Sequence, residues 1–355
     1  MDAVDALNEI AFWLERQLAP TFKVQAFRKA AVIIGDFDTA ALEERVADGR
    51  LAGMKGIGGR TFDVISQAIG GRVPDYLENL RTRGAEPLVQ GGGDLIPRLR
   101  GDLHSHSEWS DGGTSIELMA SAARSLGREY LALTDHSPTL TIANGLTADR
   151  LDEQLAAVAR VNEGAGSTSG STSGSSSGGS SGSFRLLAGI EVDILESGEL
   201  DQTPAMLARL DIVVASVHSK LRADSDTMTR RMLRAIADPH TNVLGHCTGR
   251  MVQGTRGTRP PSEFDSERIF AKCAERGVAV EINSRPERQD PPDELIEVAL
   301  RAGCLFSIDS DAHAPGHLDF IQYGAERAAR NGVPHDRIVT TWPLERLLDW
   351  SQKGR

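Results

Sequence analysis

Seven short apolar runs, each followed by a stretch of helical periodicity, recur between residues 99 and 310. The apolar runs have the length of strands and lie near residues 99–104, 130–135, 185–191, 211–217, 242–246, 278–283 and 304–310. The helical stretches include residues 116–126, 148–161, 204–210, 226–237, 266–276 and 293–302. Strands that alternate with helices form parallel sheets, because each crossover helix returns the chain to the same edge. The pattern therefore predicts an α/β fold, built as a parallel barrel.

The composition is that of an ordinary globular chain, since 40% of the 355 residues are hydrophobic and 25% are charged. This excludes wholesale disorder and collagen-like repeats. No uninterrupted apolar stretch approaches 18 residues, and the acidic start lacks the layout of a secretion signal, so we expect no membrane partner. Three cysteines are too few for a disulfide framework. We therefore expect a cytoplasmic protein.

The chain divides into parts by its sequence pattern. Residues 1–83 have helical periodicity, residues 84–98 have the glycines and prolines of a linker, and the barrel pattern occupies residues 99–345. The barrel is interrupted at residues 164–183, which comprise ten Ser, seven Gly, two Thr and one Ala. Such a segment cannot bury enough apolar surface to offset its ordering entropy, which predicts a flexible loop of natural or engineered origin.

A glycine-rich turn in the helical part favours contact with phosphates. Its Gly-Ile-Gly sequence opens a helical stretch, so backbone N–H groups of the turn can approach an anion. The turn resembles the helix-hairpin-helix that holds DNA phosphates without reading sequence. The residues expected at DNA are Lys55, Gly56, Gly58, Gly59 and Arg60. The alternative is a tight turn between packed helices, because residues 1–100 carry 13 basic and 14 acidic residues and are not a basic surface.

Every predicted strand ends in a histidine or an acidic residue. Active-site groups of α/β barrels lie at these carboxyl ends, where side chains from all strands converge. Imidazoles and carboxylates without thiolates suit zinc, manganese or iron. The candidate metal ligands are His104, His106, Asp111, His136, Glu191, His218, His246, Asp311 and His313.

Two readings of these histidines compete. A single buried histidine is more often a hydrogen-bonded core residue than a ligand. Six of the nine histidines, however, stand at the same end of five different predicted strands. Burying so many polar groups without compensation would be very costly, and a packing core would use Val, Ile and Leu there. The joint pattern therefore predicts metal binding.

The combined motifs resemble the polymerase and histidinol phosphatase (PHP) superfamily. They read His-x-His…Ser-Asp-Gly, Thr-Asp-His-Ser, Gly-x-Glu, Val-His-Ser, Gly-His-x-Thr-Gly-Arg and Ser-Asp-Ala-His, and they span residues 99 to about 345. Within the superfamily the chain is most similar to the PHP module of bacterial family-X DNA polymerases, whose front domain residues 1–83 also resemble. The resemblance implies a distorted seven-stranded (β/α)7 barrel that holds three divalent metal ions.

The resemblance also implies how the ligands are shared. His104, His106, Glu191 and Asp311 would hold the first ion, and Glu191 would bridge to a second ion that His218 also binds. The remaining coordination would come from Asp111, His136, His246 and His313.

The sequence departs from the family in three places. Cys247 stands where the family usually has proline, and we interpret it as a small apolar substitute. No lysine occurs between Lys55 and Lys220, so the Schiff-base chemistry of a 5′-deoxyribose-phosphate lyase is not expected. The barrel pattern runs nearly to the last residue given, which leaves no room for a polymerase palm.

Clustered divalent ions generate hydroxide at neutral pH and neutralise charge on phosphoryl oxygens, so the expected activity is hydrolysis of phosphate esters. Arg250 is expected to clamp a phosphate oxygen, Lys220 to add a second positive charge, and Asp135 to orient the neighbouring His136. Asp193, Glu281 and Asn283 are expected to line the mouth without an assigned role.

Three functions remain open from the sequence. The helical part favours a phosphodiesterase or phosphatase that acts on DNA or nucleotide 3′ ends. The net charge of −11 favours a small-molecule phosphomonoesterase of histidinol-phosphatase type. A non-catalytic DNA-binding module ranks last, because it predicts missing ligands and all nine positions are filled. The sequence leaves the oligomeric state open.

Overall fold

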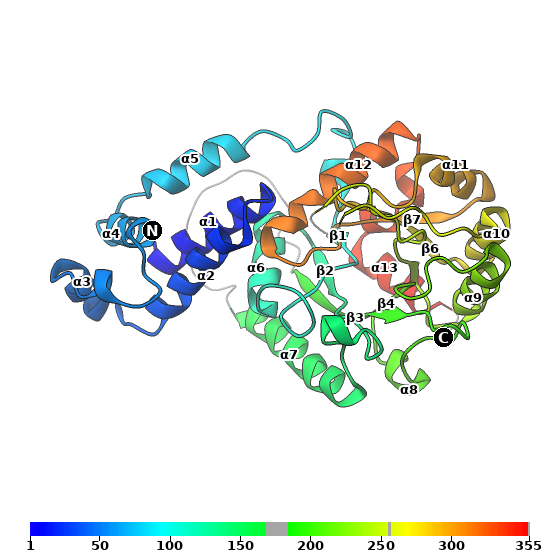
Figure 1. Cartoon of the computed structure of the whole chain (residues 1–355), viewed down its shortest axis with the longest axis horizontal. Helices are drawn as coiled ribbons and strands as arrows, with labels where there is room; N and C mark the ends of the chain where they lie inside the picture. Colours follow the sequence, from blue (N-terminus) through cyan, green and yellow to red (C-terminus); the bar gives the residue numbers. More distant parts are fainter. Residues whose placement is uncertain (168–183, 255–256, 354–355) are drawn as a thin grey trace. The chain divides into compact units, whose positions relative to one another are not determined.

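The computed structural model describes residues 1–167, 184–254 and 257–353. The chain forms two compact units, residues 1–88 and 89–355, and each is described by itself (Figure 1). Most of the glycine- and serine-rich segment 164–183 lies outside the described residues, so its predicted flexibility stays a prediction. None of the helices in the described ranges is long and apolar enough to cross a membrane.

The first unit is built from helices that pack around an aliphatic core. The α-helices are α1 (Ala3–Arg16), α2 (Thr21–Gly35), α3 (Thr39–Ala47), α4 (Gly59–Ile69) and α5 (Asp75–Gly84), with a short 3-10 helix η1 (Leu51–Gly53). Leu7, Ile10 and Ile65 are fully buried where α1, α2 and α4 meet. Leu7 and Ile10 are three residues apart and so share one face of α1, which packs against the other helices.

The second unit is a parallel barrel of seven strands, as the strand-then-helix pattern predicted. The strands are β1 (Gly101–Asp102), β2 (Tyr130–Leu133), β3 (Arg185–Asp193), β4 (Ile212–Ser216), β5 (Val243–Leu244), β6 (Ala279–Asn283) and β7 (Leu305–Asp309). They pair in sequence order from β1 to β7. The barrel is nearly closed, because Ser105 beyond β1 bridges Ala312 beyond β7 and the amide of Leu103 donates to Asp309.

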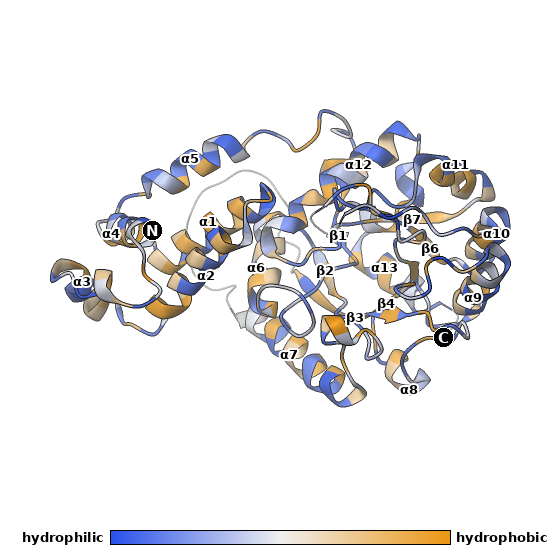
Figure 2. Cartoon of the chain, in the orientation of Figure 1, coloured by the Kyte–Doolittle hydropathy of each residue, from blue (hydrophilic) through white to orange (hydrophobic). Residues whose placement is uncertain are grey.

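Helices surround the strands of the barrel (Figure 1). They are α6 (Ile116–Ser125), α7 (Ala148–Ser167), α8 (Pro204–Leu207), α9 (Ser225–Ala237), α10 (Ser266–Arg276), α11 (Asp293–Ala302), α12 (Ile321–Arg330) and α13 (Leu344–Ser351), with 3-10 helices η2 (Ile96–Arg98), η3 (Thr141–Ala143), η4 (Pro315–Phe320), η5 (His335–Arg337) and η6 (Val339–Thr341). Figure 2 shows bands of both hydrophobic and hydrophilic residues along α7, α9 and α11, as amphipathic helices require. Strands β2, β4 and β6 are buried along their whole length, which the continuous apolar runs predicted.

Candidate metal centre

The carboxyl ends of the strands bring the nine candidate ligands to one end of the barrel. His104 and His106 follow β1, and the backbone of Ser105 between them bridges Ala312, which lies between Asp311 and His313. The two ligand pairs therefore lie side by side at the seam where the barrel closes. A second parallel bridge joins His136 beyond β2 to Glu191 in β3.

The Glu191 carboxylate lies at the centre of the cluster and is buried, with 1% of its surface exposed. Its Oε1 lies 2.8 Å from His246 Nε2 and 3.2 Å from His218 Nε2. Its Oε2 lies 2.8 Å from His136 Nδ1, 3.3 Å from His104 Nε2 and 3.6 Å from His106 Nε2. Five rings from the ends of four strands, β1, β2, β4 and β5, therefore face one carboxylate.

A second carboxylate, Asp111, gathers rings on the outer side of the cluster. Its Oδ1 lies 3.3 Å from His313 Nε2, 3.5 Å from His136 Nε2 and 3.9 Å from His106 Nδ1. Asp111 comes from the loop between β1 and α6, and Gly112 lets that loop fold back on itself, since a Cβ there would lie 2.7 Å from the Ser107 backbone. The predicted ligand Asp111 thus reaches the cluster from outside the strands.

Within the described part of the chain, ligand atoms close enough to share an ion form three groups. These are His106 with Asp111, His136 and His313; His104 with His106 and Glu191; and His136 with Glu191 and His218. Asp311 adjoins the first two groups, because its Oδ1 lies 3.4 Å from His106 Nε2. His246 adjoins the third group through Glu191.

Many polar atoms of the cluster are buried and have no hydrogen-bond partner among the described residues. They are His104 Nε2, both ring nitrogens of His106, His136 Nδ1, His218 Nε2, both ring nitrogens of His246 and both carboxylate oxygens of Glu191. Leaving a buried polar atom unpaired is costly, and each of these atoms is a type that binds divalent cations. The donor set therefore fits metal ions.

The protonation equilibria of the metal-free cluster are strongly shifted. Burial and the neighbouring His313 and His136 lower the pKa of His106 to about 3. Burial also works against a charged His136, but Glu191 and Asp111 outweigh it and raise the pKa of His136 to about 10. Burial disfavours the ionised form of Glu191, yet His136, His104 and His218 hold its pKa well below the usual range. The rings of the cluster are thus arranged around the ionised carboxylate of Glu191.

The three predicted catalytic residues, Arg250, Lys220 and Asp135, have different surroundings in the structure. Arg250 donates from Nε to the carbonyl of Arg288 and from Nη2 to the carbonyl of Gln289, so its guanidinium holds the loop after β6. Lys220 is exposed, with a positive φ of 54°.

Asp135 is buried and acts on a different loop from the expected one. Its carboxylate accepts hydrogen bonds from the amide and hydroxyl of Ser107, from Ser110 and from Gln154. Because Ser107 and Ser110 lie between His106 and Asp111, Asp135 fixes the loop that carries these two predicted ligands.

Two arginines that sequence reasoning did not select stand at the cluster. Arg288 donates from Nε to Asp311 Oδ2 at 3.0 Å, and Arg285 Nη1 lies 3.8 Å from Asp311 Oδ1 and 3.2 Å from His313 Nδ1. Both follow β6 in the run Asn283-Ser-Arg-Pro-Glu-Arg. Their position after a strand end was the available signal, since the residues that follow β1, β2, β4, β5 and β7 supply candidate ligands.

The predicted DNA-contacting turn in the first unit has its backbone exposed. Gly56 adopts a positive φ of 100°, Ile57 is buried beneath the turn, and Gly58 precedes the first residue of α4. Lys55, Gly59 and Arg60 are exposed, and the Arg60 guanidinium lies over the Tyr76 ring. Within the turn the amide of Ile57 donates to the Met54 carbonyl and the amide of Gly58 to Thr61 Oγ1, so the first residues of α4, Gly59 and Arg60, are what the surface presents, and DNA contact stays a prediction.

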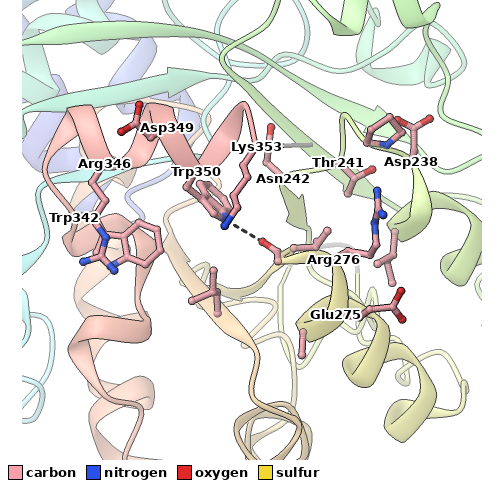
Figure 3. Close-up of a pocket in the computed structure, with 16 residues that line it drawn as sticks. Asp238, Thr241, Asn242, Glu275, Arg276, Trp342, Arg346, Asp349, Trp350 and Lys353 are labelled. Carbon is pink, nitrogen blue, oxygen red and sulfur yellow. Dashed lines mark hydrogen bonds between the residues drawn. The ribbon is translucent and has the colours of Figure 1, made fainter. Parts of the chain in front are cut away.

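A cavity of about 560 Å³ lies at the opposite end of the barrel, before strands β5, β6 and β7. Figure 3 shows its wall, in which Trp350 donates a 2.9 Å hydrogen bond to the carbonyl of Gly277. Trp342, which precedes α13, and Arg346 in α13 also line this cavity. None of the nine candidate ligands lines this cavity. The metal centre is therefore separate from it.

Comparison with known families identifies the class to which this fold and cluster belong. The PHP domain matches residues 102–285, and the chain belongs to the PHP family. The expected resemblance is confirmed, and the matched span begins at β1 and includes seven of the nine candidate ligands.

The chain is also similar to individual proteins of known sequence or structure. The chain is 36% identical to the DNA polymerase/3′-5′ exonuclease PolX of Bacillus subtilis over 244 residues, which are 69% of this chain but 39% of that protein. It is 25% identical over 264 residues to a probable phosphatase of Aeromonas hydrophila, covering 72% of this chain and 94% of that protein. One similar solved structure is the histidinol phosphate phosphatase of Lactococcus lactis, complexed with zinc, L-histidinol and phosphate. It aligns with this chain with a TM-score of 0.42 and 15% sequence identity, and the alignment covers 61% of this chain and 87% of that chain.

Proposed function

We propose that this protein is a metal-dependent phosphoesterase that hydrolyses phosphoric ester bonds. The observation that carries the proposal is the convergence of buried, unpaired imidazole and carboxylate atoms on Glu191 among the described residues. Membership of the PHP family and the probable phosphatases among the relatives support it. We assign the barrel to residues 99–345 and a helix-hairpin-helix domain to residues 1–83.

The three groups of ligand atoms would hold three divalent ions, of zinc, manganese or iron. The first group is centred on Asp111, and the other two share Glu191. Asp311 would complete the coordination beside His106, and His246 would do so beside Glu191. Such ions, when bound, lower the pKa of water and stabilise negative charge on phosphoryl oxygens.

The chain's own residues bind and orient the substrate around these ions. Arg285 and Arg288 bring two positive charges to the Asp311 and His313 side of the cluster, where they can take phosphoryl oxygens in fork-like hydrogen bonds. Arg250 supports this loop by binding the carbonyls of Arg288 and Gln289. Lys220 adds an exposed charge after β4, and Asp135 keeps the loop that carries His106 and Asp111 in place.

The substrate we favour is a DNA or nucleotide 3′ end. The exonuclease named in the PolX relative supports this choice, as do the exposed residues Gly59 and Arg60 at the start of α4, since a helix N-terminus suits phosphates. The second candidate is a small phosphomonoester, which the near full-length match to a probable phosphatase and the net charge of −11 favour. All three cysteines are unpaired and buried, which agrees with a cytoplasmic location.

Two substitutions test the metal-dependent mechanism. His104→Ala and Asp311→Ala should each lower phosphatase activity by at least about 100-fold, because each removes a group that faces the ions. Metal content measured by elemental analysis should fall in both variants. Glu345→Ala, at an exposed position in the first turn of α13, is the control and should retain both. Full activity in both ligand variants would contradict the mechanism.

A panel of substrates separates the two candidates. With added manganese or zinc, we would compare a 3′-recessed DNA duplex, single-stranded DNA, an aryl phosphate and histidinol phosphate. We expect cleavage of the DNA substrates. Turnover of only the aryl and histidinol esters would favour the small-molecule phosphatase, and no turnover of any substrate by metal-loaded protein would contradict both.

A further inference from the structure

Two buried carboxylates, Asp193 and Glu281, lie behind the cluster and contact candidate ligands from outside. Asp193 is the last residue of β3, and its Oδ1 hydrogen-bonds with Nδ1 of His218. Glu281 lies in β6, and its Oε1 is 2.6 Å from Nδ1 of His104. Asp193 is 3% exposed and Glu281 is fully buried, so neither is a surface charge that happens to lie near a ring.

The two rings they contact are oriented in the same way. His218 turns Nε2 to Oε1 of Glu191 at 3.2 Å, and His104 turns Nε2 to Oε2 of Glu191 at 3.3 Å. A carboxylate at Nδ1 accepts a hydrogen bond from the N–H of that nitrogen and leaves the lone pair of Nε2 free to bind a cation. Each carboxylate thus fixes both the tautomer and the direction of one ring.

The other described rings of the cluster have no such carboxylate behind them. Neither ring nitrogen of His246 or His106 has a hydrogen-bond partner among the described residues. His136 points Nδ1 at Glu191 itself. His313 turns Nδ1 to the backbone carbonyl of Asp311, itself a candidate ligand, at 2.9 Å. A hydrogen bond from Nδ1 to a carboxylate outside the nine candidate ligands is therefore seen at His104 and His218. These two rings belong to different groups of ligand atoms, since His104 lies with His106, His218 lies with His136, and Glu191 belongs to both groups.

We propose that Asp193 and Glu281 are positioning residues, each of which controls the binding of a different ion. Asp193 acts through His218 on the ion between His136, Glu191 and His218. Glu281 acts through His104 on the ion between His104, His106 and Glu191. This inference rests on the metal centre proposed above. The sequence placed Asp193 and Glu281 at the mouth of the barrel without assigning them a role, and the inference now gives each of them one.

The test compares metal binding by the full-length chain and its amide variants. Metal-stripped wild type, Asp193→Asn and Glu281→Gln would each be titrated with Mn²⁺ and, separately, with Zn²⁺, following heat by calorimetry and bound metal by elemental analysis. An amide keeps the shape of the side chain but lacks the charge that favours the required tautomer. We expect each variant to lose about 10- to 100-fold in affinity for one equivalent of metal while the others bind as in wild type.

Additional variants distinguish positioning from a merely structural role. Asp211→Asn is the matched control, because Asp211 accepts a hydrogen bond from the Ala188 amide and contacts no candidate ligand. Asp193→Glu restores the charge and should recover part of the lost affinity. The melting temperature of the metal-free protein should be nearly the same in wild type, Asp193→Asn and Glu281→Gln.

The outcomes separate this inference from the function on which it depends. If wild type binds no metal, the proposed metal centre is wrong. If wild type binds metal and both amide variants bind every equivalent equally well, Asp193 and Glu281 are not positioning residues. Loss of all equivalents together with a large fall in the melting temperature of the metal-free protein would also overturn the inference, because it would indicate collapse of the barrel mouth.

Discussion

At the scale of single residues, two buried carboxylates, Glu15 and Glu191, have very different partners. In the first unit, the buried Arg28 guanidinium lies 2.9 Å from Glu15, so opposite side chains neutralise each other. At the barrel mouth, neither oxygen of Glu191 has a hydrogen-bond donor among the described residues, although five imidazole rings surround it. Such a carboxylate is stable only if the rings are protonated or if rings and carboxylate bind cations together.

The ion pair between Glu9 and Arg81 allows a prediction about pH. Burial disfavours ionised Glu9, but hydrogen bonds from Arg81 and Trp13 outweigh it and hold the pKa of Glu9 below its usual value. A lowered carboxylate pKa stabilises the fold above the unfolded-state pKa, near 4.5, and this stabilisation is lost as the pH falls through the folded-state pKa. Glu9→Gln should therefore lower the free energy of unfolding at pH 7 by less than about 1 kcal/mol, since the pair is partly exposed.

The measurement for this pair is urea unfolding of both proteins at pH 7 and at pH 3. The difference between wild type and Glu9→Gln should shrink at pH 3. An equal difference at both pH values would show that the lost charge is not its cause.

At the scale of elements, strand ends were predictable and connections were not. The seven strands lie within or next to the seven apolar runs, because buried parallel strands are continuously apolar. The sequence did not predict α12, where Gly324 lies so close to the strands that a Cβ would be 2.3 Å from Ser284 Oγ. Nor could it predict that Arg285 and Arg288 turn back to Asp311, since that depends on how the loop after β6 folds.

The connection from β2 to α7 shows how a loop positions a ligand. It closes where the Leu146 amide donates to the His136 carbonyl at 2.7 Å, and a Cβ at Gly145 would lie 1.9 Å from the Ser137 carbonyl oxygen. Gly145→Ala should therefore push the two ends of the loop apart, lower the free energy of unfolding by about 1–3 kcal/mol and weaken metal binding at His136.

Urea unfolding and metal titration measure the two effects of Gly145→Ala. Gly93→Ala is the control, because a Cβ at Gly93 meets no atom within 4 Å. If Gly145→Ala binds metal as wild type does, the close approach of the loop ends does not position His136.

At the scale of the whole molecule, charge is distributed unevenly. Residues 1–100 carry a net charge of −1, so residues 101–355 carry −10 of the total of −11. The six histidines and three carboxylates of the cluster all lie in this acidic part. A molecule with this distribution attracts cations to the barrel and gains little from general attraction to nucleic acid, so any DNA binding must depend on local contacts such as the Gly56–Gly58 turn.

Stability of the barrel should consequently depend on metal. Ions that bind the folded chain and not the unfolded chain stabilise it by about 2.7 kcal/mol at a free concentration 100 times Kd. For a unit of this size, that corresponds to a melting temperature about 5–10 °C higher. Chelation of metal-loaded protein should lower the melting temperature by this amount, and added Mn²⁺ or Zn²⁺ should restore it. His104→Ala should respond much less, because it lacks one of the rings that face Glu191. Equal melting temperatures for metal-loaded and chelated wild type would mean that the groups around Glu191 neutralise one another by protonation, and that the barrel mouth is held together without ions.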